Sequence, residues 1–316
     1  YGSLSPAFTL ASFKFLEGVY DVLHEHQEQF QDFLDWVPTI LHKYYPDLAA
    51  QLQHELDHNT GECLATILPS IDMTIPAISC FVKERWLDQP SMDACFDAFD
   101  GLYNTNANIF IFTIDLSTLV SSDDDTSEWS AFHNRIFDVK SLTDIIGALP
   151  MRVEECKDNK GCGCHKRGGC KKNEYRCECD DHCVCNQRDG CEHYDPCDCL
   201  PDHWTYFRLD LRRSVFFFGD SLDNDLPKAR IARVKKFIAM AIQPPGDNTI
   251  DPDTRWLTKI HDMPEQPQYS GSCGVIVLNT IQHALDPLTP IWTPENNQEH
   301  RAHMLELAYR RKEMLI

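Results

Sequence analysis

The sequence predicts an α+β fold, in which helices flank a mixed β-sheet, and three observations carry this prediction. The β-rich runs HWTYFRLDL (203–211) and SVFFFGDSL (214–222) are separated by a short polar turn, a spacing typical of an antiparallel hairpin. A continuous apolar helical pattern begins at Cys273. Along the chain, the segments follow in the order helix, strands, helix, strand and helix, which indicates segregated α and β elements.

The first part of the chain is predicted to be helical. Apolar side chains recur at steps of three and four through residues 1–60, and Pro38 interrupts them, which predicts a kink or break. We interpret residues 1–79 as a helical extension whose role is packing.

The middle of the chain combines a helix, a strand and a connector. A Trp-Leu pair precedes a short helix within 84–103, and Pro90 stands near the helix start, where its missing N–H costs little. The run NIFIFTIDL (108–116) predicts a buried strand. We expect residues 129–155 to form a mixed, partly helical connector.

Beyond the hairpin, three further elements complete the predicted main domain. Residues 227–242 form an amphipathic pattern typical of a helix, 254–262 are strand-like, and 295–314 form a charged amphipathic helix. We assign residues 80–155 and 200–316 to this domain.

Composition excludes several classes of protein. The chain is 42% hydrophobic and 25% charged, which is typical of a soluble globular protein. No apolar run approaches the ~20 residues that span a bilayer, so we expect no membrane partner, and no secretion signal is recognised. The net charge of −20 disfavours general binding to nucleic acid, because phosphates would be repelled.

Three residues stand where these elements would bring catalytic groups together. Cys273 lies where a loop enters a helix, and the free N–H groups there favour a thiolate. His203 opens one strand of the hairpin and Asp220 closes the next, so both fall at the same end of the ribbon. There the carboxylate can orient the imidazole, as a thiol nucleophile and its base require.

These residues resemble the ubiquitin-like-protein-specific proteases, the SUMO-protease family in the adenain-like clan of cysteine peptidases. The resemblance rests on four elements in the family's order: Arg85-Trp86-Leu87-Asp88, His203-Trp204, Asp220-Ser221-Leu222 and the segment PEQPQYSGSCG with the pair Cys273-Gly274. It covers about residues 80–300, with a Cys-rich insertion, and implies a papain-like, adenain-like catalytic domain.

The resemblance also implies a role for each matched position. Cys273 would attack the carbonyl group, His203 would deprotonate the thiol, and Asp220 would orient His203. A glutamine upstream of the nucleophile would donate its amide N–H to the oxyanion, and Gln266 is favoured over Gln268 on spacing.

A narrow substrate channel is implied as well. Trp86 and Trp204 would line it and admit only a flexible tail of small residues such as Gly-Gly. Gly274, beside the nucleophile, permits close approach of the substrate backbone.

The expected substrate is a ubiquitin-like modifier, cleaved after its C-terminal glycine. A SUMO-like modifier is favoured, with NEDD8 and ubiquitin as alternatives. Ser272 stands where many SUMO proteases have Asp, which leaves the identity of the modifier open. Other interpretations are an acyltransferase of the same clan, or an inactive protease fold that serves as a zinc-stabilised interaction module. The motifs would fit a nuclear or cytoplasmic protein.

A Cys-rich segment at 156–199 marks a separate insertion. With almost no apolar residues it cannot form an ordinary core, so metal or covalent links must order it. An odd cysteine count, no secretion signal and a reactive thiol elsewhere favour zinc over disulfides. We expect two or three structural Zn²⁺ ions and no cofactor for catalysis. The lysines of 165–172 would support DNA contact, but acidic residues elsewhere in the insertion cancel their charge, so DNA binding is not favoured. The predicted ligands are Cys156, Cys162, Cys164, Cys170, Cys177, Cys179, Cys183, Cys185, Cys191, Cys197 and Cys199.

Overall fold

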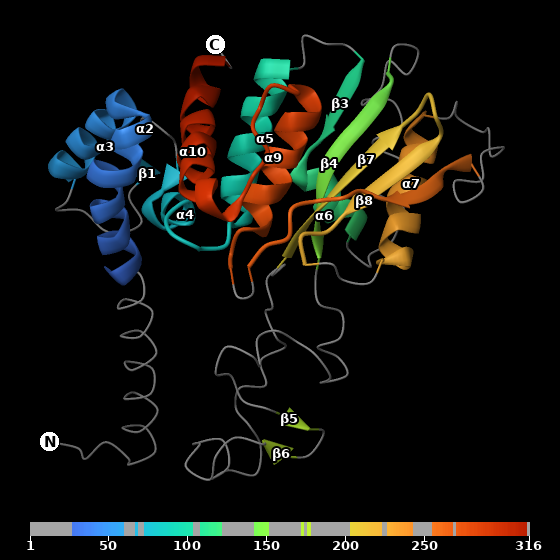
Figure 1. The fold of residues 1–316 in the computed structure, drawn as a ribbon, viewed down its shortest axis with the longest axis horizontal. Helices are drawn as coiled ribbons and strands as arrows, with labels where there is room; N and C mark the ends of the chain where they lie inside the picture. Colours follow the sequence, from blue (N-terminus) through green and yellow to red (C-terminus); the bar gives the residue numbers. More distant parts are fainter. Residues whose placement is uncertain are drawn as a thin grey trace, which may run out of the picture.

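The structure is a computed structural model, shown in Figure 1. It contains no helix, among the residues that it describes, that is long and apolar enough to cross a membrane. The described residues are 27–59, 67–68, 73–103, 108–121, 142–151, 172–173, 176–177, 203–222, 226–242, 255–267 and 270–314.

A five-stranded mixed sheet forms the centre of the fold, as Figure 1 shows. Its strand order is β3-β4-β7-β8-β9, with parallel pairs at the two edges and antiparallel pairs between them. This mixed sheet confirms the predicted α+β class. The strands are β3 (Ile109–Phe112), β4 (Asp144–Met151), β7 (His203–Asp210), β8 (Val215–Gly219) and β9 (Leu257–Ile260).

Strands β7 and β8 form the predicted hairpin. Tyr206 pairs with Gly219 and Asp210 with Val215, so the register is set over five residue pairs. The turn between them ends at Ser214, which adopts φ 54 in the left-handed region. Because the strands run antiparallel, the start of β7 and the end of β8 meet at one edge of the sheet.

Helices cover both faces of the sheet (Figure 1). One buried cluster joins α5 (Gln89–Tyr103), α9 (Cys273–Leu285) and α10 (Asn297–Met314) to Trp204 and Tyr206 of β7. The other joins α6 (Ile114–Ser121) and α7 (Lys228–Ile242) to Phe207 and Leu209 of the same strand. Neighbouring residues of β7 therefore alternate between two cores, as the pleat of a strand requires.

The predicted helical extension shares a core with the rest of the fold. Phe33, Trp36 and Leu52 are buried in the same cluster as α9 and α10. Pro38 lies in a π-helical segment, which accounts for the predicted interruption. The extension contains helical residues 27–36, η1 (Val37–Leu41), α2 (His42–Tyr44) and α3 (Pro46–Asn59), followed by β1 (Ile67–Leu68), β2 (Met73–Thr74) and α4 (Ile75–Ser79).

Two predictions for the middle of the chain were wrong. The expected connector contains β4, whose six inner residues are all buried, because a short apolar run with flanking polar residues suits a central strand. The expected strand at 108–116 ends at Phe112, and helix α6 begins at Ile114. The Thr113 hydroxyl lies 3.5 Å from the N–H of Leu116, a contact that favours a helix start.

The other predicted elements of the main domain are observed. Pro90 is the second residue of α5, and α7, β9 and α9 fall within their predicted ranges. A short 3₁₀ segment, η6 (Pro294–Asn296), precedes α10. The Cys-rich insertion lies outside the described residues except for one antiparallel pair of two-residue strands, β5 (Lys172–Asn173) and β6 (Arg176–Cys177).

Candidate active site

The hairpin brings a histidine and an aspartate into contact at one end of the sheet. His203 is the first residue of β7, and Asp220 directly follows β8. Their Nε2 and Oδ1 atoms lie 2.5 Å apart, and both side chains are buried. Asp220 Oδ1 also accepts a hydrogen bond from the backbone N–H of Leu222 at 2.8 Å, which fixes the carboxylate.

The environment of His203 favours its charged form. Burial by itself would lower the pKa of the imidazole, but the hydrogen bonds to Asp220 and Cys273 outweigh burial and raise that pKa to about 10. Because Asp220 occupies Nε2, the remaining ring nitrogen, Nδ1, is the one open to the Cys273 sulfur. Nδ1 is buried and makes no hydrogen bond of ordinary length within the described residues.

Cys273 is the first residue of helix α9, as predicted. The side chain of the preceding residue, Ser272, does not cap the helix, so the positive end of the helix dipole lies beside the thiol. The Trp204 backbone N–H points at Cys273 Sγ from 3.5 Å. Cys273 is 0% exposed, so its thiol is enclosed by the surrounding side chains.

Gln266 lies next to these groups. Its backbone N–H donates to the carbonyl of Ser221 at 2.9 Å, and its Oε1 accepts from the hydroxyl of Ser221 at 3.3 Å. Its Nε2 donates to the carbonyl of Ser270 at 3.2 Å. Gln266 therefore links the residue after Asp220 to the loop before Cys273. The alternative, Gln268, lies outside the described residues.

The residues predicted to line a channel have different surroundings. Trp204 is buried, and its indole N–H donates to the carbonyl of Leu87 at 2.8 Å. Trp86 is half-buried at the edge of the larger core. At Gly274, an added Cβ would come within 3.0 Å of the Leu87 side chain. The glycine thus lets α9 pack against the segment that carries Trp86.

A polar network beside Cys273 was not predicted from the sequence. The Glu84 carboxylate lies within hydrogen-bond distance of the hydroxyls of Ser270 and Ser272 and of the Asn297 side chain. Arg301 reaches the same loop from α10. The partners of Glu84 lie 186 or more residues away along the chain, so the sequence carries no local signal for this network.

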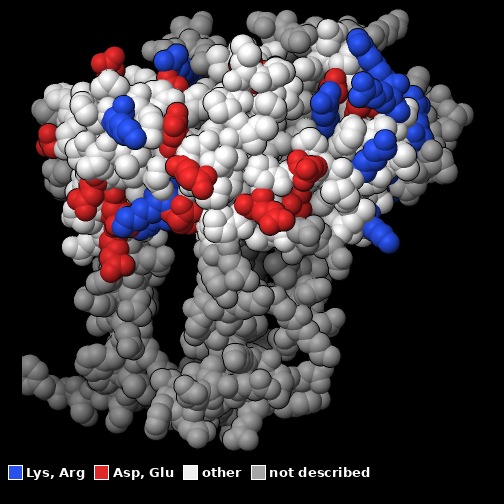
Figure 2. Space-filling view, in the orientation of Figure 1, with Lys and Arg blue, Asp and Glu red and all other residues white. Residues whose placement is uncertain are grey.

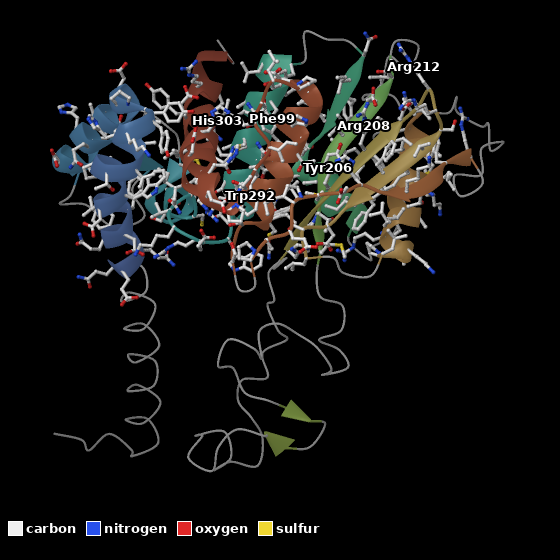
Figure 3. All side chains as sticks on the ribbon, viewed as in Figure 1. Phe99, Tyr206, Arg208, Arg212, Trp292 and His303 are labelled. Atoms are coloured by element: carbon white, nitrogen blue, oxygen red, sulfur yellow. The ribbon has the colours of Figure 1, made fainter. Side chains whose placement is uncertain are left out.

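The basic surface of the molecule lies away from this site. Figure 2 shows Lys and Arg gathered at the end of the sheet where Figure 3 labels Arg208 and Arg212. Arg208 pairs with Asp144 at 2.7 Å. Arg208 lies five residues along β7 from His203, a separation of roughly 16 Å, which exceeds the screening length of about 8 Å in physiological salt. The basic patch therefore has little influence on the charge of His203.

No group of three or more potential metal-ligating side chains occurs within the described part of the chain. The eleven cysteines predicted to bind zinc belong to the insertion, and the structure does not describe their side chains. Zinc binding therefore stays a prediction from the sequence.

The arrangement of the sheet and helices matches solved structures. The SUMO protease Ulp1 with its catalytic cysteine oxidised to a sulfonic acid aligns with a TM-score of 0.52 at 13% identity, over 84% of this chain and 96% of that chain. The sulfenic acid form aligns with a TM-score of 0.51 at 15% identity, over 84% and 94%. This chain has the Ulp1 fold. The Ulp1 protease domain in complex with Smt3, the yeast orthologue of SUMO, gives a TM-score of 0.46 at 14% identity, over 78% and 85%.

The Ulp1 fold confirms the predicted resemblance at the level of architecture, including the mixed sheet flanked by helices. No protein-family model and no curated protein sequence matches the chain. The roles of individual residues therefore rest on the geometry of the site.

Proposed function

We propose that this chain is a cysteine endopeptidase and isopeptidase that cleaves after the C-terminal glycine of a ubiquitin-like modifier. The observation that carries the proposal is the buried 2.5 Å contact between His203 and Asp220, which leaves Nδ1 of the imidazole open to the Cys273 thiol. A cysteine at a helix start, beside an imidazole that a carboxylate orients, is the arrangement that thiol catalysis requires.

The reaction follows from these positions. In the charged pair His203 Nδ1 already holds the proton that Cys273 has lost, and the Cys273 thiolate adds to the carbonyl carbon of the scissile bond. The tetrahedral intermediate collapses to a thioester while the imidazolium gives its proton to the leaving amine. Water, deprotonated by His203, then attacks the thioester, which releases the carboxylate product and restores the thiol.

Gln266 is the proposed oxyanion donor. Its amide nitrogen carries two hydrogens, and one of these is donated to the Ser270 carbonyl. The second is the group that would stabilise the oxyanion, a contribution typically of ~3 kcal/mol. The two contacts of Gln266 with Ser221 hold the amide in one orientation.

A narrow peptide tail is the substrate that suits this site. Cys273 is buried beside Trp204, so an extended chain of small residues is favoured over a globular segment. The solved structures with the same fold include SUMO proteases, which supports a SUMO-like modifier as the substrate.

The test is reaction with ubiquitin, SUMO and NEDD8 probes that carry a C-terminal electrophile. We expect wild-type protein to form a covalent adduct with a SUMO probe and Cys273→Ser to form none. Absence of an adduct with all three probes would overturn the proposal. Hydrolysis of a modifier–peptide fusion would then distinguish a peptidase from an acyltransferase, because only a peptidase releases the free C-terminal carboxylate without an acceptor.

A further inference from the structure

The C-terminal helix α10 places a buried cation behind the nucleophile. Arg301 is 0% exposed. Its Nη1 donates to the carbonyl of Cys80 at 3.1 Å, and its Nη2 donates to the carbonyl of Gly271 at 3.2 Å and approaches the Ser272 hydroxyl at 3.4 Å. A guanidinium removed from water is costly unless negative charge balances it nearby.

The balancing charge is the carboxylate of Glu84, and Cys273 adds a second negative charge when it is a thiolate. Burial lowers the pKa of Arg301 to about 10, and these negative charges oppose that lowering. In the described part of the chain no carboxylate contacts Arg301 directly. A carboxylate in direct contact would cancel most of the positive charge that Cys273 experiences from Arg301. Without such a contact, that charge still acts on Cys273.

Glu84 balances Arg301 from the far side of Ser272. The residue as a whole is exposed, but its carboxylate oxygens accept from buried groups: Oε2 lies 2.6 Å from Ser270 Oγ and 2.8 Å from Ser272 Oγ, and Oε1 lies 2.5 Å from Asn297 Nδ2. These hydrogen bonds and Arg301 hold the pKa of Glu84 below its usual value, although its partial burial alone would raise it. Glu84 is therefore an anion in the network.

The same network fixes the backbone before Cys273. The Gly271 N–H donates to the Glu84 carbonyl at 3.0 Å, and an added Cβ on Gly271 would come within 2.3 Å of that oxygen. Trp292, labelled in Figure 3, donates its indole N–H to Asn297 Oδ1 at 3.0 Å and so ties the start of α10 to the network.

We propose that Arg301 is a positioning residue for the peptidase proposed above. It holds the carbonyl of Gly271 and the hydroxyl of Ser272 directly before the nucleophile, and its positive charge favours the thiolate of Cys273. Glu84 balances this charge while the thiol is protonated. A role of Arg301 in catalysis rests on the proposed function. The effect of Arg301 on the ionisation of Cys273 does not depend on any protein substrate.

Arg301 acts together with the other charged groups near the nucleophile. The sheet contributes an imidazolium–carboxylate pair. The segment before α5 contributes two carboxylates and one guanidinium. On the three elements packed around Cys273 these groups are His203, Asp220, Glu84, Arg85, Asp88 and Arg301. Substitutions at Glu84 and Arg301 leave the His203–Asp220 pair in place, so they isolate the effect of the buried cation.

The test measures alkylation of Cys273 by iodoacetamide, quantified on the Cys273 peptide by mass spectrometry. The rate at about pH 6 is divided by the rate at about pH 9 in each protein, so that differences in access to the buried thiol cancel. We expect this ratio to fall about tenfold in Arg301→Met and to stay within about twofold of wild type in Arg301→Lys, which keeps the charge.

The matched variant is Glu84→Gln, which removes the opposite charge from the same network. We expect its ratio to equal or exceed the wild-type value by up to about threefold, even where its melting temperature falls. Loosening of the loop alone would lower the ratio in Glu84→Gln and Arg301→Lys as well as in Arg301→Met. Opposite responses of the two charges therefore support the proposal.

Two outcomes would overturn it. One is a wild-type ratio in folded Arg301→Met, and the other is an equal fall in Glu84→Gln and Arg301→Met. If Arg301→Met does not fold, the double variant Glu84→Gln/Arg301→Met removes both charges and tests the same point. Its ratio should lie below that of Glu84→Gln alone, and a ratio equal to that of Glu84→Gln would contradict the proposal.

Failure of this inference is distinct from failure of the proposed function. Iodoacetamide reports on the thiol without any protein substrate. A wild-type protein that forms no adduct with modifier probes but gives the predicted alkylation ratios would lose its proposed substrate and retain its activated cysteine. Normal probe labelling with unchanged ratios would retain the peptidase and remove the role of Arg301.

Discussion

The two halves of the site are held by different kinds of interaction. His203 and Asp220 belong to one hairpin, where the backbone register of β7 and β8 brings them to the same edge. The loop before Cys273 is held by Glu84 and Arg301, which come from segments far apart in sequence and contact Ser272. The base side is thus a local structure, whereas the nucleophile side depends on long-range contacts.

This difference has consequences for mutation. Damage to the hairpin register should affect the whole sheet, because β7 pairs with both β4 and β8. Damage to the loop before Cys273 can move the nucleophile while the sheet stays folded. We therefore expect the base side to couple activity to stability more strongly than the nucleophile side.

The largest expected effect is at the base itself. His203→Gln removes the group that accepts the thiol proton, and we expect the rate of adduct formation with a reactive modifier probe to fall by about a thousandfold. The measurement is the rate of probe labelling, with the melting temperature as a check on folding. Labelling within tenfold of wild type would show that another group serves as base.

Asp220→Asn tests the stability of the base side as a function of pH. The pKa of His203 is raised from 6.5 to about 10 in the folded protein. The resulting stabilisation is fully present below about pH 6.5 and is lost as the pH rises through about 10. We expect Asp220→Asn to lower the free energy of unfolding by about 3 kcal/mol at about pH 6, and by much less above pH 10.

Urea unfolding of both proteins across this pH range provides the measurement. A difference in stability that stays constant from about pH 6 to above pH 10 would contradict a charged His203–Asp220 pair.

Two glycine substitutions distinguish the nucleophile side of the site from the base side. An added Cβ on Gly271 would strike the backbone of Glu84 and Arg85, so we expect Gly271→Ala to displace the nucleophile and to slow probe labelling by about a hundredfold. The control is Gly147→Ala in β4, where the Cβ would meet Phe112 and Phe207 at 2.8 Å. It should lower the melting temperature, and labelling per folded molecule should stay within a few-fold of wild type, so that activity falls only with stability. Equal loss of labelling in both would refute the division.

The zinc prediction concerns the insertion between β4 and β7. We expect protein purified under reducing conditions to contain two or three zinc ions per chain by metal analysis. Fewer than about two would favour another way of ordering the segment. After removal of the metal by a chelator, we expect the Cys273 peptide of the wild type still to be alkylated by iodoacetamide, as quantified by mass spectrometry.

The smallest expected effect is at the surface of the nucleophile side. Asp32 forms ion pairs with Lys83 and Arg85, the latter at 2.6 Å, and so links the N-terminal extension to the segment that carries Glu84. We expect Asp32→Asn to lower the free energy of unfolding by only about 0.5 kcal/mol, with less effect in high salt. If Asp32→Asn slows probe labelling by more than the loss of folded protein accounts for, the extension helps to position the nucleophile.

The sequence predicts the base side better than the nucleophile side for a physical reason. The hairpin is encoded in 20 consecutive residues, 203–222, so its alternation and turn reveal where His203 and Asp220 lie. A buried arginine in a charged C-terminal helix looks like a solvated residue until the helix is packed. Glu84 gives no local signal either, because its partners lie 186 or more residues away.

The two errors in the predicted secondary structure have a similar origin. Strand β4 is buried on both faces, so its sequence lacks the alternation that identifies a half-exposed strand. In β3 and α6 the apolar run continues across Thr113, and only the contact of the threonine hydroxyl with Leu116 N–H marks the change to helix. Gln266 was chosen by spacing, and its contacts with Ser221 and Ser270 could be seen only in the folded chain.

The junction of the Cys-rich insertion has an evolutionary consequence. Met151 at the end of β4 is the cross-strand partner of His203 at the start of β7. The roughly 50 residues between them leave and re-enter the sheet at adjacent positions, as the loop of a hairpin does, and loop-closure entropy grows only with the logarithm of loop length. During evolution this segment can therefore be exchanged, shortened or enlarged with little loss in the stability of the sheet. Each such exchange would preserve the pairing of β4 with β7, the strand that begins with His203.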